Sequence, residues 1–219
     1  MELDRDGAER ADRRLAEDEM AQLAILSDVL GDRPGLRAGD EPAARALVGA
    51  GSTLLALARE RLGQVARPVR VVVFDKTAGR NWGVAWHQDR TIAVVARVDT
   101  TGYGPWSRKN GVVHVEPPFE VLAGMLTVRA HLDACDETNA PLIVAKGSHR
   151  VGKVAASQAA EFALGFEQAF CLAEAGEIWL YRTPILHTSR PAEAPRRRRV
   201  LQVDFTTAVL PDGLAWAMG

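Results

Sequence analysis

The chain has 219 residues, of which 47% are hydrophobic and 25% charged, and this balance is typical of a globular protein with a substantial core. Its 27 basic and 28 acidic residues give a net charge of -1, which excludes a global attraction to nucleic acid or to an anionic membrane. No apolar run reaches about 18 residues, so we expect a cytoplasmic protein without a membrane span. Cys135 and Cys171 lack metal-site spacing, and we expect both to be reduced thiols.

The first 66 residues are expected to form a helical support region. Residues 1–14 are almost all charged or small, which predicts a solvated helical lead-in. Apolar residues at helical spacing then predict a helix that ends near residue 31. A second helical region, broken around residues 49–52, is predicted to begin with Asp40 as its N-cap.

From residue 67 the pattern changes to short β-branched or alternating runs separated by Gly, Pro, Asn and Asp. Eight strands are predicted, and they begin near residues 69, 91, 111, 125, 141, 169, 177 and 199. Strands after a helical preface predict a mainly β protein of the α+β class, a double-stranded β-helix (jelly roll, cupin-like) with helices packed on one outer face. We interpret residues 1–219 as a single domain whose catalytic core is residues 67–210.

The stretch AWHQDRTIAV, which begins at Ala85, contains a histidine and an aspartate two residues apart. In a strand, side chains two apart point to the same face, so His87 and Asp89 can reach one point while Gln88 turns away. A second imidazole from elsewhere would complete the facial triad of non-haem Fe(II) oxygenases. By itself the pair is equally compatible with ordinary polar residues at a strand edge, because such a dipeptide spacing arises by chance in roughly one such chain in three.

The segment GEIWLYRTPILHTSRPAEAPRRRRVLQVDF supplies the other parts of such a site. His187 follows an apolar strand and a Thr-Pro turn, which would bring it to the mouth of the jelly roll. Arg198 lies eleven residues further on and opens a strand in which it shares a face with Gln202 and Asp204. A cation there can anchor an organic acid, although the run of four arginines could also be a solvated patch or a nucleic-acid contact.

Together these motifs resemble the phytanoyl-CoA dioxygenase family of Fe(II)/2-oxoglutarate oxygenases. WHQD is followed about a hundred residues later by HTS, with GEIWLY before it and an arginine eleven residues after the second histidine. The stretch RAHLDACDETNAPLIVAKGSHR is similar to that family's pattern L-D-x-x-x-x-x-N-G-P-L-x-V-x-P-G-S-H. Ala140 stands where the family usually has Gly, and Lys146 stands where it usually has Pro. The resemblance covers roughly residues 69–207.

The resemblance implies that His87, Asp89 and His187 bind Fe(II) and form the catalytic centre. It implies that Arg198 forms a bidentate ion pair with the distal carboxylate of the cosubstrate 2-oxoglutarate, with Ser189 as a hydroxyl donor to the same carboxylate. Reaction with O2 would release succinate and CO2 and hydroxylate the substrate. Hydroxylation is favoured because related halogenating enzymes lack the carboxylate that Asp89 provides.

Further residues are candidates for contact with the cosubstrate or the substrate. They come from the loop before the metal strand, from residues 100–118, which resemble a lid, and from the strand near residue 129. The cosubstrate candidate is Lys76, and the substrate candidates are Asn81, Trp82, Trp106, Lys109, His114, Arg129 and His131. Their structural alternatives are an ordinary turn, a surface hairpin and a solvated strand face.

Two classes of function fit these residues. The first is a 2-oxoglutarate-dependent hydroxylase, and the basic residues near the presumed mouth favour a small anionic substrate with no nucleic-acid or membrane partner. The second is a cupin-like metal- or carboxylate-binding module without oxidative chemistry. Oxygen uptake on addition of 2-oxoglutarate separates the two, and the sequence leaves the substrate's identity and the oligomeric state open.

Overall fold

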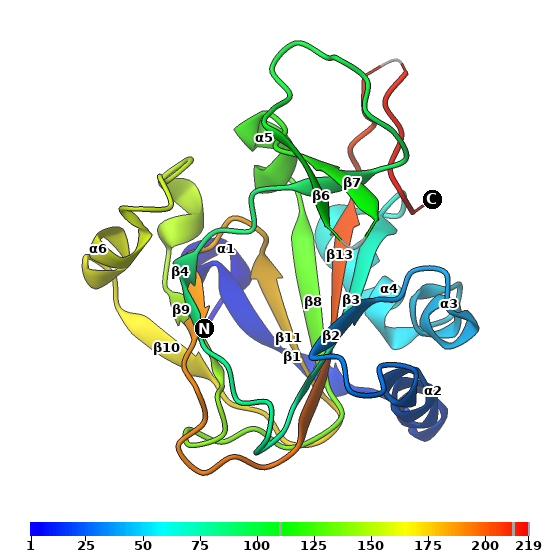
Figure 1. Ribbon diagram of the computed structural model, residues 1–219, viewed down its shortest axis with the longest axis vertical. Coiled ribbons are helices and arrows are strands. Elements are labelled where there is room, and N and C mark those ends of the chain that lie inside the picture. Colours follow the sequence, from blue (N-terminus) through cyan, green and yellow to red (C-terminus); the bar gives the residue numbers. More distant parts are fainter. Residues whose placement is uncertain (110, 212, 219) are drawn as a thin grey trace.

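A computed structural model describes residues 1–109, 111–211 and 213–218 of the chain (Figure 1). In chain order its elements are α1 Leu3–Asp6, β1 Ala8–Arg14, α2 Glu17–Asp28, β2 Gly35–Arg37, α3 Pro42–Val48, α4 Thr53–Leu62, β3 Arg67–Lys76, β4 Val84–His87, β5 Ile92–Val94, β6 Trp106–Lys109, β7 Val112–Val115, α5 Phe119–Ala123, β8 Leu126–His131, β9 Leu142–Ala145, the 3-10 helix η1 Ser148–Arg150, α6 Ala159–Leu164, β10 Gln168–Cys171, β11 Glu177–Arg182, β12 His187–Ser189 and β13 Arg198–Thr206. None of the helices in these described ranges is long and apolar enough to cross a membrane.

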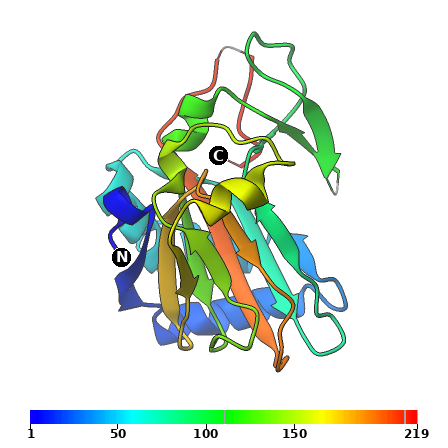
Figure 2. The same ribbon diagram turned by 90° about the vertical axis from the view of Figure 1, so that its left-hand side faces the viewer.

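Two antiparallel sheets form the walls of an open jelly roll (Figures 1 and 2). The major sheet has six strands in the order β1-β11-β8-β13-β3-β2, and the minor sheet has four in the order β10-β9-β12-β4. A third sheet, β5-β7-β6, stands at one end of the molecule (Figure 1). The prediction of a mainly β jelly roll with helices on one outer face is therefore confirmed.

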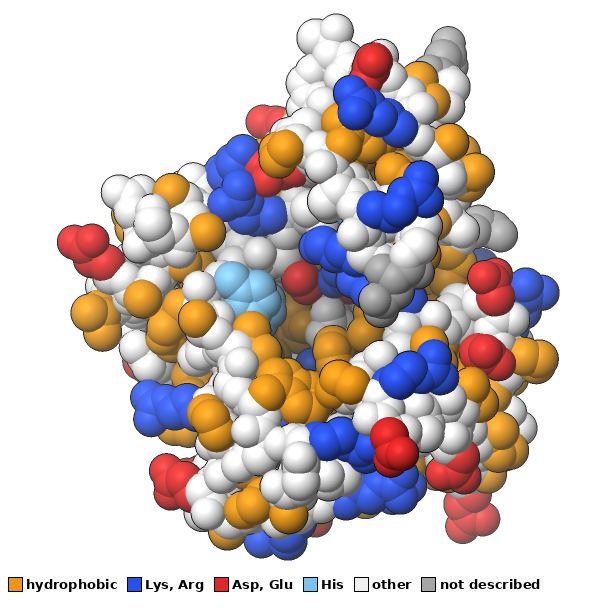
Figure 3. Space-filling model, in the orientation of Figure 1, with side chains coloured by type: hydrophobic (Ala, Val, Ile, Leu, Met, Phe, Trp, Pro, Cys, Tyr) orange, Lys and Arg blue, Asp and Glu red, His pale blue; other side chains and the backbone are white. Residues whose placement is uncertain are grey.

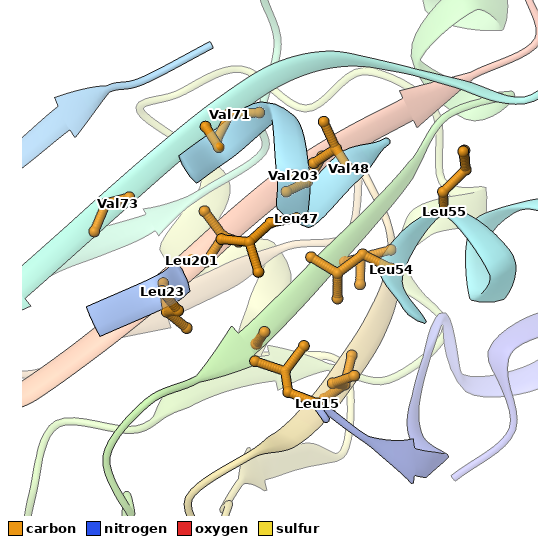
Figure 4. Close-up of a cluster of buried hydrophobic side chains, with 14 of the residues drawn as sticks. Leu15, Leu23, Leu47, Val48, Leu54, Leu55, Val71, Val73, Leu201 and Val203 are labelled. Atoms are coloured by element: carbon orange, nitrogen blue, oxygen red, sulfur yellow. The ribbon is translucent and has the colours of Figure 1, made fainter. Parts of the chain in front are cut away.

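The main hydrophobic core lies between the major sheet and helices α2, α3 and α4 (Figure 4). Val71 and Val73 of β3 and Leu201 of β13 point toward the helices and are at most 2% exposed. Burial of one such side chain stabilises the fold by roughly 1.5–3 kcal/mol. Because strand side chains alternate, the residues between them face the interior of the jelly roll, and on β3 these include Arg70 and Lys76. One face of the strand therefore packs against the helices, while the other carries both apolar and basic side chains into the interior of the jelly roll.

The predicted helical lead-in over residues 1–14 is wrong for its second half, because the short helix α1 is followed by the edge strand β1. It pairs antiparallel with β11, with Arg10 opposite Trp179, and both Arg10 and Arg14 form ion pairs with Glu177 of that strand. Edge strands commonly carry charged side chains, which discourage pairing with other chains. These charged side chains are also the reason why the sequence predicted a solvated segment and not a strand.

The predicted helices after β1 are present, with one wrong cap. The break after α3 is real, and α4 begins with Ser52 as its N-cap, whose Oγ accepts a hydrogen bond from the Leu55 amide at 3.3 Å. The N-cap of α3, however, is Glu41, which makes no side-chain capping bond, and Asp40 is fully exposed to solvent. Pro42 at the first position of α3 needs no partner for its missing N–H, so the helix begins without a polar cap.

Residues 100–118 form a packed hairpin in the described parts of the segment. Strands β6 and β7 join β5, and their apolar side chains pack with Leu210 and Trp216 from the C-terminal region. This cluster holds the hairpin at the end of the jelly roll (Figure 1), and Lys109 at the end of β6 lines the cavity described next.

Candidate metal centre and cosubstrate pocket

The sheet pairing brings two histidines together. Strands β4 and β12 are neighbours in the minor sheet, with His87 directly opposite His187 and their ring centroids 4.2 Å apart. Asp89 follows two residues after His87, and one ligand atom from each of the three residues lies within 4.8 Å of the others. Two imidazoles and one carboxylate at this spacing suit a single non-haem iron ion and leave coordination positions open.

Each imidazole is oriented by a backbone carbonyl two residues earlier. The Nδ1 of His87 lies 2.8 Å from the Ala85 oxygen, and the Nδ1 of His187 lies 2.9 Å from the Ile185 oxygen. Because a carbonyl only accepts, both Nδ1 atoms donate, which leaves the Nε2 lone pairs for a metal. Burial, followed by the charge of His87, lowers the pKa of His187 to about 4, so this ring is neutral at physiological pH.

The carboxylate of Asp89 is held through one of its oxygens. Its Oδ2 accepts hydrogen bonds from Arg70 Nη2 at 2.9 Å and from Gln202 Nε2 at 3.2 Å. Within the described residues both bonds end on Oδ2, so Oδ1 is the oxygen open to a metal. Burial raises the pKa of Asp89, but the charges of Arg70 and the two histidines lower it more, and the net result lies well below the usual range. Asp89 is therefore ionised, as a metal ligand must be.

Arg70 connects this carboxylate to a second, more deeply buried one. Its Nε lies 2.5 Å from Asp204 Oδ2, and Asp204 Oδ1 accepts a hydrogen bond from Thr127 at 3.0 Å. On the other side of Asp89, the Gln202 side-chain oxygen accepts from Arg129 Nη1 at 3.1 Å. The metal carboxylate thus lies in the middle of a hydrogen-bonded chain that crosses the major sheet.

Gln88 turns away from the metal site, as predicted from the sequence. Its Nε2 donates to the carbonyls of Gly152 at 3.0 Å and Pro184 at 2.8 Å, and its Oε1 accepts from the Val154 amide at 2.9 Å. The prediction that one strand carries both His87 and Asp89 is wrong, because strand β4 ends at His87 and Asp89 lies in the loop that follows. The buried amide of Gln88 instead fixes the backbone between the two ligands.

Two buried cations lie side by side near the metal. Arg198 and Lys76 are opposite each other on β13 and β3 and are only 2% and 4% exposed. Within the described chain, Nε and Nη1 of Arg198 have no hydrogen-bond acceptor. Burial and the nearby Arg129 charge lower the pKa of Arg198 to about 10, and burial with the Arg198 and Arg129 charges lowers that of Lys76 to about 8. A carboxylate from a bound molecule would offset this unfavourable burial.

Ser189 lies next to these cations, but its hydroxyl is already used. Its Oγ donates to the Ala140 carbonyl at 3.0 Å and accepts from Lys76 Nζ at 3.2 Å. Lys76 also donates to the Trp82 carbonyl at 2.7 Å and lies 4.9 Å from the centre of the Trp82 ring. Lys76 is therefore better placed than Ser189 to support Arg198 in holding a carboxylate.

These groups line one cavity of about 970 Å³ that opens on the face shown in Figure 3, where a histidine and an acidic side chain lie in the hollow beside several basic ones. The predicted site residues that line it are His87, Asp89, His187, Arg198, Ser189, Lys76, Asn81, Trp82, Lys109 and Arg129. Asn81 also forms two hydrogen bonds with the backbone of Ala192, at 2.9 and 2.6 Å, which hold its loop.

Three substrate candidates lie outside this cavity wall in the described structure. Trp106 packs in the hydrophobic cluster of the third sheet, and His114 is fully buried behind it with Nδ1 on the Val112 carbonyl at 3.1 Å. His131 is also fully buried, and its Nδ1 lies 3.3 Å from the Glu177 carbonyl. Strand alternation does place His131 on the inner face with Arg129, but neighbouring side chains cover it.

Sequence reasoning missed the residues that support the metal ligands. Arg70 interrupts an otherwise apolar strand, and a charge in such a position requires a buried partner, so it gave a usable signal. The signal from Gln202 was weaker, since this residue shares the strand face of Arg198 but does not lie at a motif spacing from either histidine. The partners of both residues depend on strand register, which is a property of the fold.

Comparison with known proteins agrees with this geometry. The family model for phytanoyl-CoA dioxygenase matches residues 4–200, whereas no curated protein sequence matches. The solved structure of EvdMO1 has a TM-score of 0.68 and 18% identity over 93% of this chain, which spans only 48% of EvdMO1. AviO1 from Streptomyces viridochromogenes Tue57 has a TM-score of 0.70 and 18% identity, covering 95% of this chain and 93% of AviO1.

EctD from S. alaskensis, solved with 2-oxoglutarate and 5-hydroxyectoine, has a TM-score of 0.66 and 19% identity over 93% of this chain and 73% of EctD. At these identities the structural likeness establishes the fold, and the family model extends over most of the chain. The buried arginine and the facial triad then fit the cofactors that the sequence motifs implied, iron and 2-oxoglutarate. We conclude that this chain belongs to the phytanoyl-CoA dioxygenase family and is a non-haem iron- and 2-oxoglutarate-dependent oxygenase.

Proposed function

We propose that the protein hydroxylates a small, anionic organic molecule. The observation that carries this proposal is the buried Arg198 guanidinium, which lies in the same cavity as the facial triad and whose Nε and Nη1 have no acceptor among the described residues. The residues fit both groups that the reaction needs, because the triad offers three ligand atoms and Arg198 with Lys76 offers the charge for a distal carboxylate. When bound, iron with 2-oxoglutarate and O2 supplies oxidation of a C–H bond, with release of succinate and CO2.

The chain's own contribution is to orient the reactants and to exclude water. His87 and His187 present fixed Nε2 atoms, and Asp89 presents a charged oxygen whose partner oxygen is held by Arg70. Apolar side chains from several strands make up much of the remaining wall, which limits solvent around the reacting atoms: Leu36, Val72, Phe74, Val84 and Leu142. Such a cavity suits a molecule with an apolar part that reaches the metal.

The presence of Asp89 supports hydroxylation as the outcome. Its carboxylate fills the ligand position that a halogenating relative would need for halide, and Arg70 with Gln202 keeps it there. EctD, whose structure was solved with 2-oxoglutarate and 5-hydroxyectoine, supports a small-molecule substrate for a protein of this fold. The cavity also has more cations than 2-oxoglutarate can offset, which favours an anionic substrate.

The proposal is tested by anaerobic addition of Fe(II) and 2-oxoglutarate, followed by O2. We expect a weak visible absorption band before O2 is added and succinate formation afterwards. Small anions are then screened as substrates, and a substrate should increase the rate of succinate release. Asp89→Ala should abolish the turnover, and Arg198→Gln should weaken 2-oxoglutarate binding by at least about tenfold, the usual effect of losing a buried charged partner.

A matched control for Arg198→Gln is Arg196→Gln. Arg196 belongs to the same arginine run, but it is exposed and pairs with Asp136, so its loss should leave 2-oxoglutarate binding unchanged. A protein that binds 2-oxoglutarate but consumes no O2 and forms no succinate with any tested anion would instead be a binding module.

A further inference from the structure

Two basic residues at the cavity mouth have no carboxylate partner in the described chain. The other arginines near the mouth do have one: Arg80 lies 3.1 Å from Asp75, and Arg90 lies 2.8 Å from Glu116. Arg37 of β2 and Lys109 of β6 line the same cavity, yet neither forms an ion pair with any described residue. Their charges are therefore available to a bound molecule.

Arg37 and Lys109 come from different parts of the fold. Arg37 lies at the end of the edge strand of the major sheet, half-buried, and its Nε is buried without an acceptor among the residues described. Lys109 lies at the end of β6 in the hairpin of the third sheet, and its Nζ contacts only the Thr91 hydroxyl, at 3.2 Å, in the described structure. Both residues line the cavity whose hollow is visible on the face shown in Figure 3.

Both residues lie near other cations. Burial lowers the pKa of Arg37, and the charge of Arg70 lowers it further, while the Asp89 charge offsets part of this. Partial burial lowers the pKa of Lys109, the charges of Arg70 and Arg37 add to this, and the Asp89 charge again opposes them. His114, in β7 of the same hairpin, responds in the same way, since burial and then the Arg37 and Lys109 charges lower its pKa to about 4. A bound anion would relieve this mutual repulsion.

We propose that Arg37 and Lys109 bind an anionic group of the substrate, a carboxylate or a phosphate, at the cavity mouth. The proposal rests on the proposed function and adds the substrate's orientation. With the anionic group held at the mouth, the uncharged part of the substrate extends along the apolar wall toward His87 and Asp89. The oxidised carbon should therefore lie at the end of the molecule away from the anionic group.

The test uses calorimetric binding to the full chain, kept anaerobic and saturated with Fe(II) and 2-oxoglutarate so that the deep cations are occupied. The probes are phenylacetate and phenyl phosphate, with the uncharged phenylacetamide as a comparison. We expect the two anions to bind at least tenfold more tightly than the amide. Arg37→Gln and Lys109→Gln should each weaken anion binding by about tenfold, as expected for one charge-assisted contact, and should leave amide binding unchanged.

Arg108→Gln is the matched control. Arg108 precedes Lys109 in β6, points to the other face by strand alternation and donates to the Gly111 carbonyl, so this variant should bind the anions like the unmodified chain. Equal binding of amide and anions, no binding of any probe, or an equal loss in the Arg108 variant would contradict the proposal. The 2-oxoglutarate absorption band and succinate formation are measured separately on each variant, so failure of the oxygenase function is distinguished from failure of the anion site.

Discussion

Arg70 supports the metal site without being one of its three ligand residues. Arg70 bonds Asp89 on one side and Asp204 on the other, and its side chain is only 11% exposed. Burial lowers its pKa, but the two carboxylates raise it more, so the guanidinium stays charged. It holds Oδ2 of Asp89 and leaves Oδ1 toward the two histidines. Burial and the Asp89 charge raise the pKa of Asp204, and the Arg70 charge opposes this rise.

We predict that Arg70→Gln weakens metal binding by about 10- to 100-fold, the range reported for loss of a residue that orients a metal ligand. The free energy of unfolding of the variant should also be lower by roughly 3 kcal/mol, because two buried carboxylates lose their shared cation. Fe(II) titration under anaerobic conditions and urea unfolding measure the two effects. Arg70→Lys should recover part of the metal affinity, and a purely structural role would give the loss of stability with unchanged metal affinity.

We predict that protonation of Lys76 makes 2-oxoglutarate binding depend on pH. Its pKa of about 8 in the free protein means that it is protonated below that pH and neutral above it. A carboxylate binds the protonated form, so affinity for 2-oxoglutarate should fall as pH rises from about 7 to 9. Arg198, with a pKa of about 10, keeps its charge through this range. Equilibrium binding at several pH values should show this fall in the unmodified chain, and Lys76→Met should remove it, whereas an unchanged slope in that variant would exclude Lys76.

At the scale of the elements, one loop residue adopts a costly backbone conformation. Ala140, just before β9, has φ of 55°, in the left-handed region that glycine adopts without steric cost. This is the position where the related family usually has glycine. Its carbonyl accepts the Ser189 hydroxyl, so the conformation is held by the pocket.

We predict that Ala140→Gly stabilises the protein by roughly 0.5 kcal/mol, since the relief of strain exceeds the added flexibility of the unfolded chain. Urea unfolding measures the difference. The neighbouring Ala134→Gly, in the same connection, provides a comparison in which the left-handed conformation is absent, and there we expect a loss of stability. A destabilised Ala140→Gly protein would show that the methyl group contributes more than the strain costs.

Elements that are apolar and regular were predictable, and elements shaped by their neighbours were not. Strands β3, β8, β11 and β13 come from runs rich in apolar and β-branched residues, and all four are present near the expected positions. Strand β1 was missed because its charged side chains are explained only by the adjacent Glu177 of β11. Strand β12, with three residues, is too short to show any period and exists because β9 and β4 lie on both sides of it.

At the scale of the whole molecule, the jelly roll separates stability from chemistry. The helices and the outer face of the major sheet form the core, while the inner faces of the two sheets carry the metal ligands and the buried cations. The metal centre joins the minor sheet to the major one, because Asp89, which follows β4, is held by Arg70 and Gln202 from β3 and β13. Bound iron and cosubstrate would therefore connect both walls of the fold.

The sequence by itself determined the fold class and predicted that His87, Asp89 and His187 lie together near Arg198, because strand alternation and fixed spacing are local properties that the chain displays directly. It also indicated that Gln88 turns away from the metal. Only the tertiary structure decided which residues support those ligands and which candidates reach the cavity. Lys109 lines the cavity, whereas Trp106 and His114 pack elsewhere. Arg37 also lines it, from strand β2, which the sequence pattern did not predict. These contacts depend on strand register and on the packing of distant segments, which the order of residues along the chain does not reveal.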